Sequence, residues 1–199
     1  MKHTPKLNMD QYVYPETNVL KNLRGIRDRE QLSRFEMDMT TRRIEALEHD
    51  PIPGRLDSAH LRAIHRYIFQ DVYEWAGEFR TVNICRSDQY YFAFCDRIEP
   101  ALFDTLGRLL KERHLAGLEA AGFCARAGYF LGEINAVHPF RDGNGRTQRE
   151  FVRQLAVRNG FALHWAGVTQ AQMGAASKLS FQKGDNSGLA ELIQTAIAA

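Results

Sequence analysis

Apolar residues recur every three or four positions over most of this chain, the spacing that places them on one buried face of a helix. The pattern predicts helices over about residues 28–47, 57–75, 96–116, 118–137, 145–158, 168–181 and 187–198. Asp57 offers an N-cap for the second helix, and Asp96 with Glu99 resembles a capping box that opens the third. Most of the chain is therefore expected to be helical.

One segment breaks the helical pattern. Between residues 80 and 94, Val82 and Ile84 alternate with polar neighbours, residues 87–89 are turn-like, and residues 90–94 are rich in aromatic side chains. This pattern is typical of two short strands joined by a turn. The sequence therefore predicts an all-α fold with one β-hairpin.

The length of 199 residues favours a single compact body with an appended arm. We expect an N-terminal arm and helix over residues 1–55, packed on a core domain over residues 56–199. The first 20 residues are polar and irregular, and Tyr12 and Tyr14 should pack them onto the body. The predicted helix over residues 118–137 is dense in alanine and glycine, which suits a central helix that its neighbours approach closely.

The composition is that of an ordinary soluble globular protein, with 44% hydrophobic and 25% charged residues. A formal net charge of +2 argues against wholesale binding to nucleic acid or to a membrane surface. The chain has no run of about 18 apolar residues and no apolar stretch behind its N-terminal lysines, so neither a membrane span nor a cleaved export signal is expected. Three cysteines without a C-x-x-C pair predict neither a zinc site nor a disulfide framework, which fits the cytoplasm.

The chemically informative stretch runs from His138 to Arg149, between the two clearest helical patterns. Pro139 disfavours helical geometry for the residue before it, so the preceding helix should end at His138 and leave the imidazole beside a loop. Gly143 and Gly145 allow left-handed turns and close backbone approach just before the next helix, where N–H groups can converge on an anion. The stretch therefore outlines a phosphate-binding loop.

The side chains around this loop suit a nucleotide. Asp142 is a hard oxygen ligand of the kind that Mg²⁺ prefers, and Arg146 and Arg149 lie three positions apart, so both can face phosphate oxygens. A glycine-rich helix start with a solvated basic face explains any one of these residues but not the set. A P-loop is excluded because G-x-x-x-x-G-K-[ST] is absent, and a Rossmann turn because a third glycine and a preceding strand are missing.

The stretch resembles the core pattern of the Fic domain, H-x-F-x-[D/E]-G-N-G-R-x-x-R, at every defined position. The Fic fold is all-α with a β-hairpin flap upstream of the motif, where the sequence independently predicts a hairpin. The resemblance implies transfer of AMP from ATP to a Tyr, Thr or Ser hydroxyl of a target protein, with release of pyrophosphate. Gly145 favours AMP transfer over phosphorylation, since the phosphorylating Doc branch of the superfamily has lysine at this position.

The resemblance also implies a role for each residue of the motif. His138 is the expected general base that takes the proton of the target hydroxyl, and Phe140 is expected to anchor the loop in the core. Asp142 is the expected ligand of Mg²⁺, which bridges the α- and β-phosphates. The remaining residues are expected to bind ATP: Gly143, Asn144 and Gly145 at the anion hole, and Arg146 and Arg149 at the β- and γ-phosphates.

The hairpin is the expected docking site for the target protein. An extended target segment adds to such a flap as a strand, and main-chain hydrogen bonds then bring its hydroxyl near His138. The residues expected to do this are Val82, Asn83, Ile84, Tyr90, Tyr91 and Phe92. Core packing under the hairpin explains the aromatic side chains among them equally well.

Many Fic proteins are inhibited by a helix with the pattern [S/T]-x-x-x-E-[G/N], whose glutamate pairs with the second arginine of the motif. Glu45 follows Thr41 at this spacing, and Glu191 follows Ser187 in the same way. Neither glutamate is followed by glycine or asparagine. The length and the N-terminal Tyr-x-Tyr-Pro arm are more similar to the class I Fic toxins, in which a small separate antitoxin supplies the helix. The resemblance then implies a bacterial toxin, with DNA gyrase and topoisomerase IV as candidate targets.

Other functions stay open at this point. One is a catalytically idle module that senses nucleotide through the same site, and another is a Fic enzyme that transfers UMP or phosphocholine or removes AMP. A nucleic-acid-binding face is a third, and the balanced charge argues against it. The residues that would form that face are Arg141, Arg146, Arg149 and Arg153.

Overall fold

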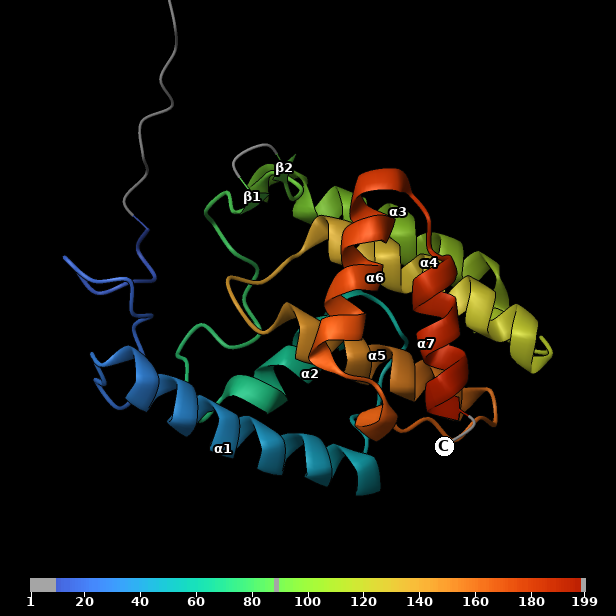
Figure 1. Cartoon of the computed structure of the whole chain (residues 1–199), viewed down its shortest axis with the longest axis horizontal. Helices are drawn as coiled ribbons and strands as arrows, with labels where there is room; N and C mark the ends of the chain where they lie inside the picture. The colour runs from blue at the N-terminus through green and yellow to red at the C-terminus, as the bar shows by residue number, and fades with distance from the viewer. Residues whose placement is uncertain (1–9, 88–89, 198–199) are drawn as a thin grey trace, which may run out of the picture.

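The computed structural model describes residues 10–87 and 90–197, a set of packed helices with a small hairpin beside them (Figure 1). The helices are α1 (Arg29–His49), α2 (Ser58–Phe69), α3 (Ile98–Lys111), α4 (Ala120–Val137), α5 (Asn144–Arg158), α6 (Gln170–Lys183) and α7 (Ser187–Ile197). The strands are β1 (Cys85–Ser87) and β2 (Tyr90–Tyr91), and short 3₁₀ turns form η1 (Cys95–Arg97), η2 (Arg113–Leu115) and η3 (Trp165–Gly167). The expected all-α fold with one β-hairpin is confirmed.

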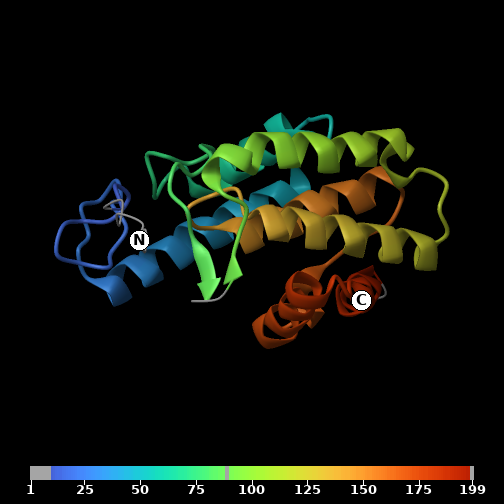
Figure 2. The same ribbon diagram turned by 90° about the horizontal axis from the view of Figure 1, so that it is seen from above.

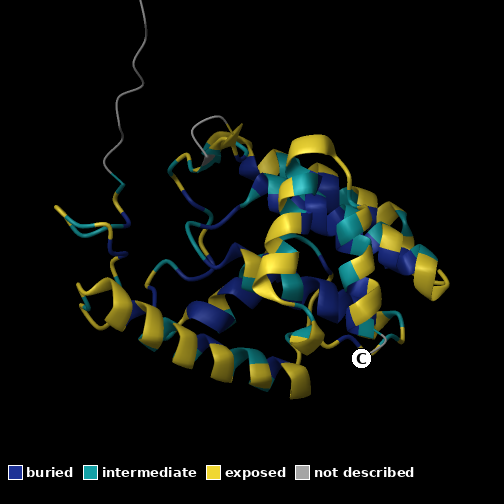
Figure 3. Cartoon of the chain, in the orientation of Figure 1, coloured by how far each residue is buried: buried dark blue, intermediate teal, exposed yellow. Residues whose placement is uncertain are grey.

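Helix α4 lies at the centre of the fold and contacts α3, α5, α6 and α7. Figure 2 shows α6 and α7 together on one side of α4, with α3 and α5 on the other, and Figure 3 shows how much of α4 and α5 is buried. A Cβ atom at Gly128 would lie 2.8 Å from the backbone nitrogen of Ala190, and one at Gly132 would lie 2.2 Å from Oδ1 of Asn186. The expectation of a closely approached central helix is therefore confirmed.

Residues 10–28 form an irregular arm that packs on the helical body. Tyr12 is buried and meets Trp75 edge-on, with 5.5 Å between the ring centroids. The backbone N–H of Thr81 donates a hydrogen bond to the Tyr12 hydroxyl at 3.2 Å. Tyr14 is half buried against the core. Both tyrosines of the arm thus pack against the hydrophobic core.

The second helix is shorter than its apolar pattern predicts. Helix α2 ends at Phe69, and the N–H groups of Val72 and Tyr73 both donate to the carbonyl oxygen of Phe69 in a series of turns. Gly77, with φ 85°, then redirects the chain toward the hairpin. Val72 is nonetheless fully buried. The apolar spacing thus predicted the burial of this segment correctly and its helical geometry wrongly.

The predicted capping box at Asp96 and Glu99 is wrong. Helix α3 begins only after the 3₁₀ turn η1, its N-cap is Arg97, and no side chain caps it. The Asp96 carboxylate instead lies 3.7 Å from the Arg97 guanidinium. Because the 3₁₀ turn delays the start of α3, Asp96 is too far upstream to act as its N-cap.

The hairpin pairs over fewer residues than predicted. Its strands are antiparallel with an irregularity within β1, and the predicted turn residues Asp88 and Gln89 lie outside the described residues. Nearer the base of the hairpin, the carbonyl oxygens of Val82 and Ala93 accept hydrogen bonds from Arg80 rather than from the opposite strand. This side chain therefore replaces part of the expected ladder. Among the described helices, none is long and apolar enough to cross a membrane.

Candidate active site

The loop between α4 and α5 begins at His138. The backbone of His138 is left-handed, with φ 49° and ψ 63°, and its N–H closes the last turn of α4 on the carbonyl oxygen of Ile134 at 3.0 Å. Pro139 follows, and a residue before proline avoids helical geometry. The imidazole therefore stands at the junction of helix and loop, where the sequence predicts it.

Two side chains fix the shape of this loop. The Asn144 amide accepts a hydrogen bond from the backbone N–H of Phe140 at 2.9 Å and donates one to the carbonyl oxygen of Phe140 at 2.8 Å. Phe140 is buried and stacks on the His65 ring, with 3.9 Å between the centroids. The Asn144 side chain is thus engaged within the loop. Its backbone N–H lies in the first turn of α5, where helix N–H groups have no intrahelical partner and can bind an anion.

The two glycines of the motif play different parts. Gly143 has φ 78°, and a Cβ atom there would lie 2.2 Å from the ring of Phe69, so both its conformation and its surroundings require glycine. Gly145 lies inside α5, which begins at Asn144, one residue earlier than predicted. The left-handed turn expected at Gly145 is therefore wrong, because Gly143 alone completes the turn into the helix.

A neutral His65 packs against the loop and forms a hydrogen bond with its backbone. Its Nδ1 accepts a hydrogen bond from the backbone N–H of Gly77 at 2.8 Å, and its Nε2 lies 3.0 Å from the carbonyl oxygen of Asp142, to which it donates. Burial lowers the pKa of His65 to about 3, although the bond to Asp142 opposes this shift. A protonated His65 would have to give up the bond from Gly77.

Acid should therefore destabilise the protein through His65. The unfolded chain binds a proton on this residue below pH 6.5 and the folded protein does not until about pH 3, so the free energy of unfolding falls as the pH decreases through this window. Urea unfolding of the His65→Gln variant between pH 6 and 4.5 should show a shallower pH dependence than the wild type. His49→Gln, at an exposed position of α1, is the control. Equal slopes for wild type and His65→Gln would contradict the prediction.

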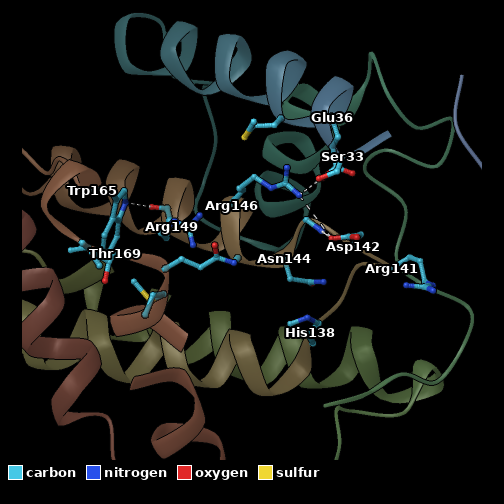
Figure 4. Close-up of a pocket in the computed structure, with 16 residues that line it drawn as sticks. Ser33, Glu36, His138, Arg141, Asp142, Asn144, Arg146, Arg149, Trp165 and Thr169 are labelled. Carbon is cyan, nitrogen blue, oxygen red and sulfur yellow. Dashed lines mark hydrogen bonds and ion pairs between the residues drawn. The ribbon is translucent and has the colours of Figure 1, made fainter. Parts of the chain in front are cut away.

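A pocket of about 740 Å³ opens over the loop (Figure 4). Its lining includes every motif residue assigned a chemical role from the sequence: His138, Asp142, Gly143, Asn144, Gly145, Arg146 and Arg149. Two other segments complete the wall, one from α1 and one from residues 165–173. Parts of the chain that are far apart in the sequence therefore share one site.

The surroundings of His138 favour a neutral imidazole. Its Nδ1 lies 3.3 Å from the carbonyl oxygen of Asn135, which can only accept, so Nδ1 carries the hydrogen and Nε2 is left as the basic atom. The ring of Phe92 stacks on the imidazole with 3.8 Å between the centroids. Burial, aided by the positive charges of Arg80 and Arg86, lowers the pKa of His138 to about 4 against the effect of the Asn135 bond. Nε2 can therefore accept a proton at neutral pH.

Arg146 is held by residues of α1 that the sequence did not connect with the site. Its guanidinium donates to the Glu36 carboxylate at 2.6 Å and to the Thr40 hydroxyl at 3.1 Å, and lies 4.6 Å from the ring centroid of Phe69. The hydroxyl of Tyr73 donates to the other oxygen of Glu36. These contacts fix the position of Arg146 without a ligand. Nothing in the sequence distinguishes Glu36 from the other charged residues of α1.

Arg149 faces the other end of the pocket (Figure 4). Burial, and next the nearby charge of Arg146, lower the pKa of its guanidinium. The backbone carbonyl oxygen of Arg149 accepts a hydrogen bond from the Trp165 indole at 3.1 Å. Trp165, Thr169 and Met173 also line the pocket. These residues follow the motif at a distance and carry no sequence pattern that marks them as part of a site.

Asp142 meets the requirements of a magnesium ligand. Its carboxylate lines the pocket and is 46% exposed, with Oδ1 3.9 Å from the Arg146 guanidinium. Burial of part of this group and the negative charge of Glu36 raise its pKa, while the N–H of Gly143 opposes the shift by donating to the carboxylate. Mg²⁺ in nucleotide sites is bound by one or two carboxylates together with substrate phosphates. One accessible carboxylate beside the N-terminus of α5 fits that donor set.

The predicted docking residues stand beside the pocket rather than in its wall. Asn83, Tyr90 and Tyr91 are exposed, and Val82 and Ile84 are half buried. Phe92 is buried and lies against His138, so its side chain faces the imidazole and not the solvent. Tyr90 and Tyr91 are therefore accessible beside the pocket, whereas Phe92 packs against the motif histidine.

The two partial matches to the inhibitory pattern lie away from the pocket. Glu45 is exposed on α1 and Glu191 is exposed on α7, and neither lines the pocket. Another glutamate of α1, Glu36, does reach a motif arginine, and it pairs with Arg146, the first of the two.

Solved structures of Fic domains share this fold. The BepC protein of Bartonella tribocorum with bound AMPPNP is 26% identical, with a TM-score of 0.86 over 95% of this chain and 97% of that one. The N-terminal Fic domain of a Bep effector from Bartonella quintana with bound ADP is 30% identical, with a TM-score of 0.87 over 93% of each chain. The fold and the site together define a Fic domain.

Sequence comparison leads to the same family. The profile of the Fic/DOC family matches residues 55–156. The protein adenylyltransferase VbhT of Bartonella schoenbuchensis is 44% identical over 86% of this chain, which spans only 36% of that longer protein. A probable protein adenylyltransferase Fic of Salmonella typhimurium is 37% identical over 95% of this chain and 92% of its own length. The chain belongs to the Fic/DOC family, which confirms the resemblance found in the motif, and its relatives carry the name of the predicted enzyme class.

Proposed function

We propose that this protein transfers AMP from ATP to a hydroxyl group of a target protein and releases pyrophosphate. The observation that carries the proposal is the convergence in one pocket of a neutral imidazole, two guanidinium groups and an accessible carboxylate at the start of α5. Relatives solved with AMPPNP or ADP, and relatives named protein adenylyltransferases, support it.

The chemistry requires an oxygen nucleophile to attack the α-phosphorus while pyrophosphate leaves on the opposite side. Nε2 of His138 takes the proton of the target hydroxyl as the new P–O bond forms. Arg146 and Arg149 hold the phosphates and offset the negative charge that builds up on the leaving group. The N–H groups at the start of α5 add to this stabilisation. The protein thus contributes mainly orientation and charge, as in other phosphoryl-type transfers.

Asp142 is the residue that would hold Mg²⁺. When bound, the ion would neutralise charge on the α- and β-phosphates. The bond from the N–H of Gly143 to the Asp142 carboxylate, and the His65 bond to its backbone oxygen, hold this residue in place. Asp142 is therefore oriented from both its side chain and its backbone.

The proposal extends to the biological setting. A target segment would add to the hairpin beside Tyr90 and Tyr91, whose exposure leaves them available. We place the reaction in the bacterial cytoplasm, as that of a toxin held inactive by a small antitoxin that supplies an inhibitory helix. DNA gyrase and topoisomerase IV are the candidate targets, and the similarity of the chain to class I Fic toxins supports this part of the proposal.

The position of the transferred label tests the proposed reaction. Purified protein is incubated with Mg²⁺ and bacterial lysate, in parallel with ATP labelled at the α-phosphate or at the γ-phosphate. We expect a protein band labelled from the α-phosphate alone. Label from the γ-phosphate would indicate phosphorylation and contradict the proposal. Binding of ATP without label from either position would favour an idle nucleotide-sensing module, and labelled UTP in a further lane tests transfer of UMP.

A further inference from the structure

Arg80 is the largest fully buried side chain among the described residues, and it lies just before the hairpin. Its exposed fraction is 2%. The family motif does not include it, and it does not line the nucleotide pocket. A buried charge costs free energy unless polar groups surround it, so its partners indicate what it does.

Among the described residues, the hydrogen-bond acceptors of the Arg80 side chain are all backbone carbonyl oxygens. Nε donates to His138 at 2.8 Å, and a terminal nitrogen donates to Val137 at 3.2 Å, at the end of α4. The other bonds go to Val82 at 2.8 Å and to Ala93, on the two arms of the hairpin. One guanidinium therefore joins three pieces of chain: both arms of the hairpin and the backbone of the catalytic histidine.

Main-chain hydrogen bonds join the same segments of the chain. The N–H of Arg80 donates to the carbonyl oxygen of Pro139 at 2.9 Å, and that of Ala93 donates to Ala136 at 3.2 Å. The positive charge also lies at the C-terminal end of α4, where the helix dipole favours a cation. The base of the hairpin and the end of α4 are thus tied together at several points.

This arrangement uses the planar geometry of arginine. A guanidinium presents five N–H donors in a fixed plane, so it can reach acceptors on several sides at once. A lysine ammonium is a compact charge with three donors on a flexible stem and cannot span the same set. A need for packing alone would be met by an apolar side chain, without the cost of burying a charge.

We propose that Arg80 is a positioning residue for AMP transfer, one that fixes the distance and orientation between the target-docking hairpin and the His138 imidazole. This inference rests on the proposed function. A target hydroxyl bound at the hairpin reaches Nε2 of His138 only if the hairpin and the imidazole keep a fixed relative position. A misplacement of about 1 Å can lower the rate by about 10²-fold. Arg80 fixes this arrangement through the backbone of His138 and does not itself line the nucleotide pocket.

Kinetics of the Arg80→Lys variant test the proposal. We expect the initial rate of labelling of the lysate band from α-labelled ATP to fall by about tenfold to a hundredfold. The KM for ATP, and the affinity for AMPPNP measured by calorimetric titration, should stay within about twofold of the wild type, because Arg80 does not line the nucleotide pocket. Rates are compared at a temperature where thermal unfolding shows each variant to be folded.

Arg153→Lys is the matched control. Arg153 is also buried, at 7% exposure, and its guanidinium donates to the carbonyl oxygen of Leu47 at 2.7 Å and to Glu150. It lies outside the pocket and away from the hairpin. This variant should lose stability while its transfer rate at a permissive temperature stays within about twofold of the wild type. An unchanged transfer rate for folded Arg80→Lys, or an equal rate loss in both variants, would overturn the proposal.

Hydrogen exchange on the wild type keeps the proposal falsifiable if Arg80→Lys does not fold. The amides of Arg80 and Ala93 should exchange as slowly as those in the last turns of α4, since the side-chain contacts hold both arms against that helix. If these two amides exchanged as fast as amides in exposed turns, the proposed positioning role of Arg80 would be overturned. Hydrogen exchange needs no activity, so it judges the contacts of Arg80 independently of the labelling assay. A wild type that labels no target would refute the proposed function alone.

Discussion

Replacing His138 with alanine is expected to lower the rate of AMP transfer by about 10²-fold to 10⁴-fold, the usual contribution of a general base. Nε2 of His138 is the basic atom that the pocket presents in the described structure, since Nδ1 is engaged with the carbonyl oxygen of Asn135. Removal of the imidazole leaves both arginines and the start of α5 in place. Nucleotide binding should therefore persist while transfer is lost.

The measurement pairs labelling from α-labelled ATP with calorimetric titration of AMPPNP. His138→Ala should bind AMPPNP within about threefold of the wild type, because the phosphate-binding groups remain. His49→Ala, at an exposed position of α1, should match the wild type in both assays. Transfer by His138→Ala at half the wild-type rate or more would remove this residue from the mechanism.

The pH dependence of the transfer rate also tests the role of His138 as the general base. Burial lowers the pKa of His138 to about 4, so the base stays unprotonated from neutral pH down to about pH 5. The rate should be flat over that range and should fall as the pH approaches 4. A fall centred near pH 6.5, the ordinary pKa of histidine, would show that the imidazole is more hydrated in the working enzyme than its burial implies.

The second large effect is expected on stability, from Gly143→Ala. The left-handed backbone at Gly143 costs a residue with a Cβ atom about 1–2 kcal/mol. The new methyl group would also start 2.2 Å from the Phe69 ring, and relief of such an overlap in a packed core costs a further ~1–3 kcal/mol. Because the Arg146 guanidinium lies over the same ring, a displaced Phe69 should also raise the KM for ATP.

Gly160→Ala separates the two causes. Gly160 has φ 81°, close to the 78° of Gly143, but a Cβ atom there would meet nothing within 4 Å. It should show only the backbone part of the cost, with no change in the KM for ATP. The free energy of unfolding in urea measures the difference between the variants. Equal losses of stability would mean that the ring of Phe69 moves aside freely.

The elements that could be read from the sequence are those specified by local rules. Pro139 ends α4, Asp57 caps α2 by accepting from the N–H of His60, and the apolar spacing of α4 and α5 is that of buried helices. The motif residues also lie within a few positions of one another. Their meeting in one pocket follows from a single loop and the first turn of one helix, which a sequence pattern can describe.

What could not be predicted depends on contacts between distant segments. Glu36 holds a motif arginine from α1, more than 100 positions earlier in the chain, and Trp165 closes the other side of the pocket. Arg80 is buried because three pieces of chain offer it carbonyl oxygens, and no local pattern encodes that. The prediction that the segment after α2 is helical was wrong for the same reason. Val72 is apolar because it is buried against the core, and the chain there forms turns rather than a helix.

The pocket described above draws on segments both before and after the family profile, which bears on how far the chain can be shortened without losing part of the pocket. Its lining takes residues from α1 and from the segment between residues 165 and 173, whereas the family profile covers residues 55–156. A fragment trimmed to the profile would keep the motif loop but lose Glu36 and Met173, which both line the pocket. The pocket therefore extends beyond the pattern that identifies the family, and a fragment meant to keep it whole must include α1 and residues 165–173.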